Sequence, residues 1–324
     1  MKNEEAELYI GIDIGGTEAK IGLLTGDGKI MDKVNVPVSF DHYETPILVT
    51  VNRAVGEFLK KHTEDKDRIR AIGVSATGAI DSKSGVVAGC GGHIRNWLGS
   101  PIREVLEKAY GLPVFALNDA NAAALGEMWQ GGAKGKSNVL VITIGTGVGG
   151  GIIVDGHILL GNHGFAGEIG YIKPPFVPEE SLTGRGCYED YASMSALIRM
   201  VEVAARKGSM DAKYASGTNG REIFDAVKSG DKILERITEC WIGNIAAGIV
   251  SLVHIFNPEV ILIGGGVSAQ KEYFIDKLRN RVFDAIMDEF KTDLNLKAAE
   301  LKNDAGMIGA VKFCLDSLRD SGRG

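Results

Sequence analysis

The chain has 324 residues, enough for two ordinary domains, and a net charge of −6 without any basic run. This charge makes nucleic acid and anionic membranes poor candidates for its main partner. Its four scattered cysteines form no pair at metal-binding or redox spacing, which predicts reduced thiols in the cytoplasm. The acidic start lacks the apolar core of a signal peptide, and no apolar stretch is expected to span a bilayer.

The first predicted element is a hairpin with a glycine turn. Residues 8–14 form an apolar run rich in β-formers, Gly15-Gly16-Thr17 interrupts it, and residues 20–24 continue as the next strand. Asp27-Gly28 then predicts a tight turn into a third strand. A helical pattern over residues 46–61 follows, and it leads into a strand over residues 69–75.

The middle of the chain repeats this plan. A strand over 112–117 runs through Asn118-Asp119 into a helical pattern over 120–128. A strand over 139–144, the turn Gly145-Thr146-Gly147, a strand over 149–154 and Asp155-Gly156 then reproduce the first hairpin about 130 residues later. Two matching hairpin units at one offset predict a duplicated α/β domain.

The last third alternates in the same way, with a helix over 233–256, a strand over 260–263 that ends in Gly264-Gly265-Gly266, and a helix over 306–318. We place the crossover between domains near Asn118 and the return near Lys302. The predicted domains are therefore a smaller one, residues 1–118 plus 303–324, and a larger one, residues 119–302.

The second turn also satisfies G-x-G-x-x-G, the dinucleotide-binding pattern, which requires a helix directly after it. Residues 151–154 are apolar and β-branched and run into an Asp-Gly turn, so a strand is predicted and the dinucleotide interpretation is rejected. The two hairpin turns can instead hold opposite sides of a triphosphate.

The first turn has the residues that a phosphate site needs. Gly15 and Gly16 let a phosphate approach the backbone N–H groups, and the Thr17 hydroxyl can donate to it. Asp13 ends a buried strand, which is costly without a partner, and Mg²⁺ held through water would supply one. The alternative is a plain glycine-rich hairpin with a solvated Asp13.

The other polar positions are each open to two interpretations. Asn118-Asp119 is either a helix N-cap or a carboxylate that acts as a general base. Gly264-Gly265-Gly266 suits either a flat ligand or a tight strand-to-helix turn. Glu168 and Glu189 lie in glycine-rich loops and could accept hydrogen bonds from sugar hydroxyls, although a surface Glu is usually only solvated.

At these residues the sequence resembles the ROK family of bacterial sugar kinases and related repressors. The matching stretches are GIDIGGTEAKIGLL, LNDANAAALGEMWQGGAKG, VLVITIGTGVGGGIIVDGHILLGNHGFAGEIG, GRGCYEDYAS and FNPEVILIGGGVS, in the family's order. The resemblance implies duplicated actin-like (ribonuclease H-like) ATPase domains, with ATP and sugar bound in the interdomain cleft. It also implies a homodimer, which the apolar pattern over residues 242–256 supports only weakly.

Carried over by position, the resemblance assigns a role to each residue of the motifs. Asp119 would be the catalytic base, and the sugar would contact Asn96, Asn118, Glu168, Glu189 and the position of Tyr171. ATP with Mg²⁺ would be held by Asp13, Gly15, Gly16, Thr17, Lys20, Gly145, Thr146, Gly147, Gly265 and Gly266.

One departure from the family concerns a structural zinc site made of one His and three Cys. Here Tyr171 stands at the His position, Glu180 and Leu182 stand at two Cys positions, and only Cys187 remains. We therefore expect no structural zinc, and because the family's His also touches the sugar, the departure leaves the identity of the sugar open.

These residues predict a cytoplasmic ATP-dependent hexose kinase, with glucose phosphorylated at the 6-OH as the default. N-acetylmannosamine or another hexose derivative is the alternative substrate. A sugar-responsive transcription regulator is disfavoured, because the first strand begins by Leu8 and leaves no room for a helix-turn-helix. An actin-like or chaperone ATPase is disfavoured by the resemblance around Glu168 and Glu189.

Overall fold

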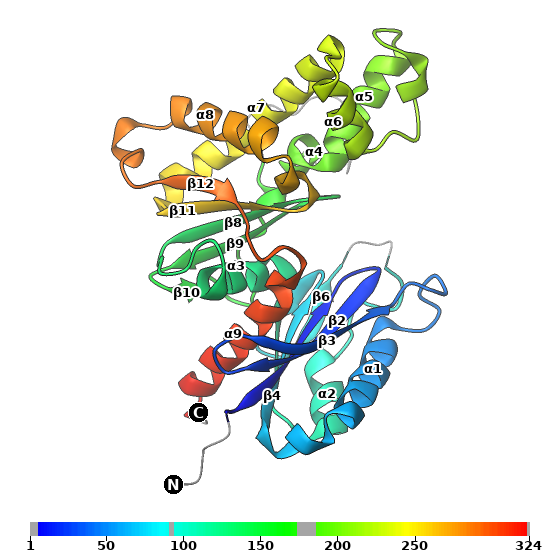
Figure 1. The fold of residues 1–324 in the computed structure, drawn as a ribbon, viewed down its shortest axis with the longest axis vertical. Coiled ribbons are helices and arrows are strands. Elements are labelled where there is room, and N and C mark those ends of the chain that lie inside the picture. Colours follow the sequence, from blue (N-terminus) through cyan, green and yellow to red (C-terminus); the bar gives the residue numbers. More distant parts are fainter. Residues whose placement is uncertain (1–5, 91–93, 174–185, 323–324) are drawn as a thin grey trace. The chain divides into compact units, whose positions relative to one another are not determined.

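The structure is a computed structural model and describes residues 6–90, 94–173 and 186–322. The chain divides into two compact units: unit 1 comprises Met1–Ser137, Gly151–Gly167 and Glu300–Gly324, and unit 2 comprises Asn138–Gly150 and Glu168–Ala299. Two five-stranded sheets with flanking helices give the predicted duplicated α/β fold (Figure 1). Helix α3 (Asp119–Gln130) lies in unit 1, whereas the predicted domain bounds placed it in the larger domain; those bounds remain a prediction.

The sheet of unit 1 has the order β3-β2-β1-β4-β7. Its strands are β1 (Leu8–Ile14), β2 (Glu18–Thr25), β3 (Ile30–Pro37), β4 (Ile69–Ala76) and β7 (Val114–Asn118). β1 pairs antiparallel with β2 and parallel with β4, and β4 pairs parallel with β7. The predicted first hairpin is confirmed, and the predicted strands 69–75 and 112–117 correspond to β4 and β7. A short hairpin of β5 (Ala79–Asp81) and β6 (Val86–Gly89) follows β4.

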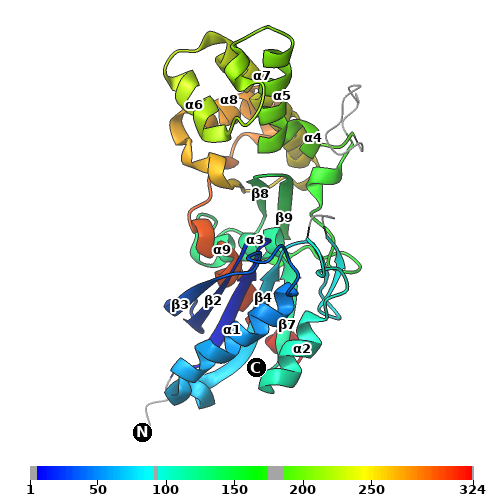
Figure 2. The same ribbon diagram turned by 90° about the vertical axis from the view of Figure 1, so that its right-hand side faces the viewer.

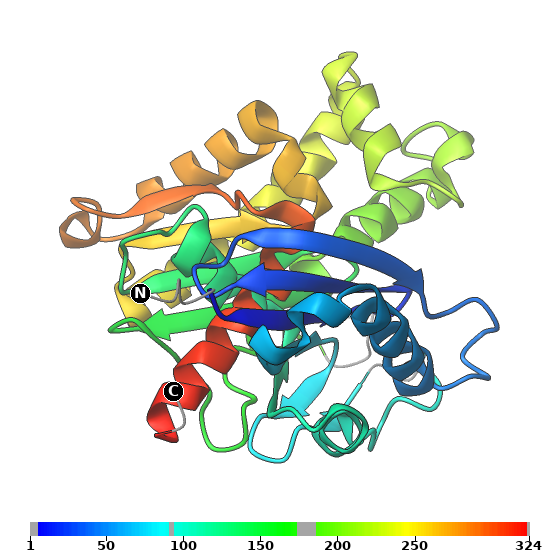
Figure 3. The same cartoon turned by 60° about the horizontal axis from the view of Figure 1, so that its bottom comes forward.

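Helices cover both faces of this sheet. The side chains of Leu8, Ile10 and Ile12 point to the face covered by α1 (Ile47–Lys61) and α2 (Ile102–Tyr110), where they join one apolar core. Tyr9 points to the other face and packs with α9 (Ala305–Asp320). Successive side chains of a strand point to opposite faces of the sheet. Because both faces are covered by helices, β1 is apolar at successive positions. Figures 2 and 3 show α1 and α2 on the side of the sheet away from α9.

Glycines allow α3 and α9 to pack closely within unit 1. A Cβ added to Gly309 would overlap the backbone carbonyl of Ala122, and one added to Gly126 would overlap that of Ala305. The buried carboxylate of Glu127 accepts hydrogen bonds from the N–H groups of Gly132 at 2.8 Å, Glu300 at 2.9 Å and Leu301 at 2.7 Å. The end of α3 and the segment that leads into α9 are therefore fixed to one another.

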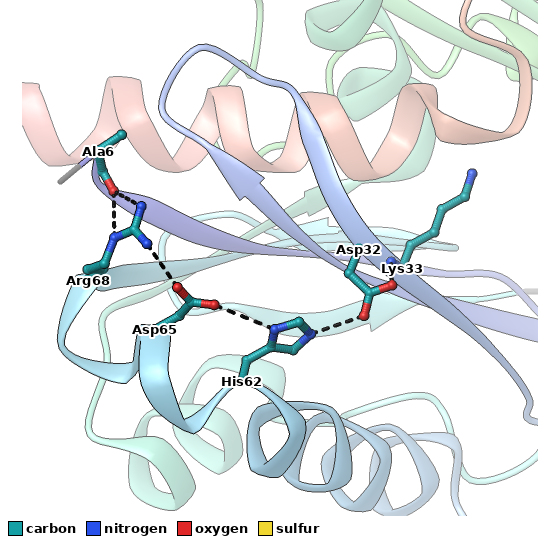
Figure 4. A network of polar contacts seen from close by, with 6 residues as sticks. All are labelled: Ala6, Asp32, Lys33, His62, Asp65 and Arg68. Atoms are coloured by element: carbon teal, nitrogen blue, oxygen red, sulfur yellow. Dashed lines mark hydrogen bonds and ion pairs between the residues drawn. The ribbon is translucent and has the colours of Figure 1, made fainter.

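A chain of polar contacts links residues at the amino ends of the parallel strands of this sheet (Figure 4). Arg68 donates from Nε to the carbonyl of Ala6 at 3.1 Å and from Nη1 to Asp65 at 2.9 Å. His62 lies 3.6 Å from Asp65 and 3.0 Å from Asp32. Because Ala6 and Arg68 precede the first residues of β1 and β4, this cluster lies at the amino ends of the parallel strands, away from the predicted site residues.

The second sheet has the order β10-β9-β8-β11-β12, with β8 (Val139–Ile144), β9 (Val148–Val154), β10 (His157–Ile158), β11 (Val260–Gly264) and β12 (Asn295–Ala298). β11 pairs in parallel with both β8 and β12. The prediction that a strand follows the second glycine turn is confirmed by β9, so the dinucleotide motif lacks the helix that it needs.

The helices of unit 2 form a group of their own (Figure 2). They are α4 (Glu189–Ala192), α5 (Met194–Arg206), α6 (Gly220–Lys228), α7 (Lys232–Phe256) and α8 (Asp276–Ala285). α7 is long and apolar enough to span a membrane by length and composition alone, which the sequence analysis had not expected of any segment. The fully buried Trp241 of α7 stacks on Phe274, with 5.3 Å between ring centroids, as a core helix does.

Candidate active site

The ends of three parallel strands meet at one edge of the sheet in unit 1. In the pairing register, Ile14 of β1 lies opposite Ala76 of β4, and Ala76 lies opposite Asn118 of β7. The glycine turn after β1 and the Asn118-Asp119 pair after β7 therefore leave the sheet at the same edge. In α/β sheets ligands bind beyond the carboxyl ends of the strands, which makes this edge the candidate site of unit 1.

Asn118 and Asp119 begin helix α3. The Asn118 side chain accepts hydrogen bonds from the N–H groups of Ala120 at 2.9 Å and Asn121 at 3.3 Å, and it donates to the carbonyl of Gly78 at 2.9 Å. Asn118 is thus the N-cap. Asp119 is the first residue of the helix, half-buried, and Oδ1 accepts from the Ala120 N–H at 2.8 Å. The cap leaves Asp119 at the positive end of the helix dipole, where a carboxylate is favoured.

Asp13 has partners within the protein. Its Oδ2 lies 2.8 Å from the Lys20 ammonium, and its Oδ1 accepts from the Ser75 hydroxyl at 2.7 Å. In the register Lys20 and Ser75 stand directly opposite Asp13 on the two neighbouring strands. The sequence analysis expected that Asp13 needs a partner and named Mg²⁺ held through water as one; the structure shows that Lys20 and Ser75 are partners within the protein. Lys20, predicted to contact the nucleotide, is here the counter-ion of Asp13.

The turn Gly15-Gly16-Thr17 is tied at two points. The N–H of Gly15 donates to the carbonyl of Glu18 at 2.9 Å, and the carbonyl of Gly16 accepts from the Tyr43 hydroxyl at 2.8 Å. Over the residues that the structure describes, the N–H groups of Gly16 and Thr17 have no acceptor in the protein. Adjacent backbone N–H groups of this kind bind phosphate oxygens, so the turn has the chemistry that the sequence predicted for it.

Asn96 lies on an exposed loop of the same unit. Its side-chain amide donates to the carbonyl of Tyr43 at 3.0 Å, so Asn96, Tyr43 and Gly16 form one hydrogen-bonded chain. Asn96, Tyr43 and His42 all have positive φ, at 55°, 65° and 55°. The left-handed region costs about 1–2 kcal/mol for a residue with a side chain, although Asn tolerates it better than most. Such residues cluster at functional sites.

Unit 2 has a second edge of the same kind. Thr143 of β8 lies opposite Gly264 of β11 in a parallel pair, so the turns at Gly145–Gly147 and Gly265–Gly266 leave the sheet together. Gly145, Thr146, Gly265 and Gly266 are all exposed. Gly265 has a φ of 87°, and a Cβ there would overlap the backbone of Ile144, so only glycine brings the two strand ends this close.

Glu189 links this edge to the predicted sugar-binding residues. One of its carboxylate oxygens would lie 2.6 Å from a Cβ on Gly147, and the same oxygen accepts from the Val148 N–H at 3.4 Å. Desolvation of the Glu168 carboxyl raises its pKa, and the negative charge of the nearby Glu189 raises it further. Unit 2 therefore brings Glu168, Glu189 and the turn at Gly147 together.

The loop of the expected zinc site is only partly within the described residues. Glu180 and Leu182 lie outside them. Tyr171 is 48% exposed, and Cys187 is buried beside Asp190, whose carboxylate accepts from the Cys187 N–H at 3.0 Å. Within the described ranges no three His, Cys, Asp or Glu side chains lie close enough to share a metal ion.

Comparison with known proteins identifies the family. Residues 9–317 match the ROK family over nearly the whole chain. The chain belongs to the ROK family. Over 315 residues it is 33% identical to a glucokinase of Thermotoga maritima, an alignment that covers 95% of this chain and 98% of that protein.

Other ROK proteins resemble it over most of its length. It is 28% identical to a xylose repressor of Caldicellulosiruptor bescii, with 98% of this chain and 80% of the repressor covered. A crystal structure of a ROK glucokinase from Streptomyces griseus, in complex with glucose and AMPPNP, has a TM-score of 0.75 and 32% identity and covers 94% of this chain and 98% of its own. The family thus includes sugar kinases and repressors, and the fold expected from the resemblance is confirmed.

The structure adds two residues to the candidate site of this ROK protein. Ser75 was included in a predicted strand only as its last residue, and its signal was a hydroxyl directly after an apolar run over residues 71–74. Tyr43 had no signal at all, because its bonds to Gly16 and Asn96 span 27 and 53 residues of sequence. The predicted residues form two sets, one around Asp13, Asn118 and Asp119 and one around Gly147, Glu168 and Glu189.

Proposed function

We propose that this ROK protein is an ATP-dependent hexose kinase that phosphorylates the 6-OH of glucose. The observation that supports this most directly is the register of β1, β4 and β7, which brings a turn with open N–H groups and the Asp119 carboxylate to one sheet edge. Phosphoryl transfer asks a protein mainly for positioned groups of these two kinds.

Each unit would contribute part of the chemistry. In unit 1 Asp119 would accept the proton of the attacking hydroxyl as general base, and the turn at Gly16 would hold phosphate oxygens. In unit 2 Glu168 and Glu189 would accept hydrogen bonds from sugar hydroxyls, and the glycines of the two strand-end turns would approach the nucleotide. Asn96 and Asn118 would complete the sugar contacts.

The residues around Asp13 fit Mg²⁺ held through water. Both carboxylate oxygens of Asp13 already accept one hydrogen bond each, from Lys20 and Ser75, and each oxygen keeps a lone pair for a metal-bound water. Mg²⁺ commonly retains several waters and binds chiefly through substrate phosphates. When bound there, it would neutralise charge on the phosphates.

A coupled assay of ADP release over a panel of sugars tests the proposal. We expect turnover with glucose that depends on both ATP and Mg²⁺, with other hexoses used less well. The panel includes glucose, N-acetylmannosamine, N-acetylglucosamine, allose, fructose and β-glucosides. If none of these sugars supports ADP release, the kinase proposal is wrong. Sugar binding without turnover would favour a regulator, the role of the related xylose repressor.

N-acetylmannosamine is the second candidate substrate. The reason is Tyr171, which replaces the His that the family places beside the sugar. An exposed phenol offers a flat ring and one hydroxyl, so it can pack against an acetamido group. A kcat/KM higher for N-acetylmannosamine than for glucose would establish this alternative.

Three further proposals concern the compartment, the metal content and the oligomeric state of the protein. The protein would act in the cytoplasm without structural zinc, and elemental analysis of protein purified without chelator should find far less than one zinc per chain. A structural site needs about four ligands, and of those at the family's positions only Cys187 remains. The protein would form a homodimer, which sedimentation at micromolar concentration should show; monomer alone would contradict it.

A further inference from the structure

Tyr43 is the residue through which the candidate sugar contact and the candidate phosphate turn meet in unit 1. Its hydroxyl donates to the carbonyl of Gly16 at 2.8 Å, and its carbonyl accepts from the side-chain amide of Asn96 at 3.0 Å. The Tyr43 side chain and backbone therefore bond to two different loops. The Tyr43 residue is half-buried, and a Cβ added to Gly16 would lie 3.9 Å from the Tyr43 hydroxyl oxygen.

The loop that holds Tyr43 is built into a defined shape. The Asp41 carboxylate accepts from the Thr45 N–H at 2.9 Å, and hydrogen bonds from Thr45 lower the pKa of Asp41. Between these two residues His42 and Tyr43 both adopt the left-handed conformation. An ordered loop that keeps two such residues indicates that the position of Tyr43 matters.

We propose that Tyr43 is a positioning residue that couples sugar binding at Asn96 to nucleotide binding at the turn of Gly16. The inference rests on the proposed function of these two loops. A sugar hydroxyl that donates to Asn96 Oδ1 fixes the amide plane, and the amide N–H then fixes the Tyr43 backbone. The Tyr43 hydroxyl in turn holds the Gly16 carbonyl.

The geometry of the peptide group transmits this restraint to the phosphate. In a trans peptide the carbonyl of Gly16 and the N–H of Thr17 point in opposite directions. Holding the carbonyl on Tyr43 therefore aims the Thr17 N–H away from Tyr43, and this N–H has no acceptor within the described chain. A bound sugar thus preorders one phosphate-binding donor, and by linkage a bound nucleotide must tighten the sugar by the same factor.

The test measures this factor directly. Titration calorimetry gives the dissociation constant of AMPPNP with and without saturating glucose, for wild type and for Tyr43→Phe, which keeps the ring and loses only the hydroxyl. We expect glucose to tighten AMPPNP in the wild type. In Y43F the ratio of the AMPPNP dissociation constants without and with glucose should fall about fivefold, because one neutral hydrogen bond contributes about 1 kcal/mol. If the wild-type ratio is smaller than about five, the ratio in Y43F should fall to one.

Tyr110→Phe is the matched control. The Tyr110 hydroxyl also donates to a backbone carbonyl in unit 1, that of Asn52, where α2 meets α1. Y110F should keep the wild-type factor. Asn96→Asp breaks the same chain at its other end, because a carboxylate cannot donate to the Tyr43 carbonyl, while Asp tolerates the left-handed backbone. The double variant Y43F/N96D should lose no more coupling than either single variant.

The outcomes separate the inference from the proposed function. Unchanged coupling in Y43F, equal loss in Y110F, or no coupling in a wild type that binds both ligands would overturn the inference and leave the kinase proposal standing. A wild type that binds neither glucose nor AMPPNP would overturn both. A factor lost in Y43F and N96D but kept in Y110F is the result that the bonded chain predicts.

Discussion

The two glycine turns have the same backbone plan and different chemistry. Asp13-Ile14-Gly15 ends β1, and Thr143-Ile144-Gly145 ends β8 in the same way. Around Asp13 stand Lys20 and Ser75, on the strands to either side. In the second repeat Thr143 lies opposite Gly264, and Gly150 occupies the place of Lys20 in the sequence. The first turn thus has a charged pair at its base and the second has none.

At the second turn the charge belongs to Glu189, which is not on a neighbouring strand. The Glu189 carboxylate lies against Gly147 and the Val148 N–H, and the Gly145 carbonyl accepts from the Met194 N–H at 2.9 Å. Duplication therefore conserved the element that orders the backbone, and the two copies differ in where a carboxylate stands. If unit 1 performs the proton transfer and unit 2 binds the sugar through Glu168 and Glu189, substitutions at Asp119 and at these two residues should affect different parameters.

The largest effect is expected from Asp119→Asn in unit 1. The amide cannot take the hydroxyl proton, and it keeps the size of the carboxylate. We expect kcat to fall about 10²–10⁴-fold, the range for a lost general base, with an unchanged thermal midpoint. Asp231→Asn is the control, because Asp231 caps α7 by accepting from Ile233 and Leu234 at 3.0 Å. Near-normal kcat in D119N would remove Asp119 from the chemistry.

The charged pair at the base of the first turn predicts a difference in stability between the repeats. Lys20→Met leaves the Asp13 carboxylate, with its side chain 16% exposed, without its counter-ion, and should lower the free energy of unfolding by about 1–3 kcal/mol. Asp13→Asn in the same chain should restore most of it. Thr143→Val, at the matching place in the second repeat, should change stability by less than about 0.5 kcal/mol. Equal losses in K20M and K20M/D13N, by urea denaturation, would contradict this account.

Substitution of the glycines in the two turns should have different effects on the KM for sugar. A Cβ on Gly147 would lie 2.6 Å from the Glu189 carboxylate, whereas a Cβ on Gly16 would lie 3.4 Å from its nearest neighbour, Ile94. Gly147→Ala must therefore displace Glu189 and should raise the KM for sugar about tenfold, the effect of a lost contact worth about 1.4 kcal/mol. Gly16→Ala should leave the sugar KM unchanged. Initial-rate kinetics with each substrate varied would decide, and a raised sugar KM in both variants would remove the distinction.

The sequence was sufficient where a local pattern determines the structure. The apolar runs and the glycine turns located β1, β8, β9 and β11, because strand period and turn chemistry are local properties. Helices α2, α4, α5, α6 and α8 were not predicted. The motifs quoted for the family placed the glycine turns and the Asn118-Asp119 pair at strand ends, and the structure has them at the ends of β1, β7, β8 and β11.

The sequence was insufficient where partners are distant along the chain. Asp13 was correctly recognised as needing a partner, but Ser75 is 62 residues away and no local pattern connects them. The hydroxyl of Tyr43 and the carboxylate of Glu127 form bonds that only the packed chain brings together. The packing of α3 against α9 likewise depends on glycines 183 residues apart, Gly126 and Gly309, and the predicted domain division at the start of α3 stays a prediction.

The smallest expected effect is a change in the pH dependence of stability, with opposite signs in the two units. Glu168 in unit 2 has a raised pKa, so its contribution to stability is present below the unfolded value of 4.5 and is lost as pH rises through the folded pKa. Glu168→Gln removes this penalty: its thermal midpoint should match that of the wild type near pH 4 and exceed it slightly at pH 7, while the sugar KM rises. Glu57→Gln in unit 1 is the control of opposite sign. The hydrogen bond from Lys60 lowers the pKa of Glu57, so E57Q should lose a little stability at pH 7, and this loss should shrink as the pH falls below 4.5 and through the folded pKa. Midpoints that differ by a constant amount at every pH, or a lower midpoint for E168Q at pH 7, would show that burial and the charge of Glu189 do not oppose the ionisation of Glu168.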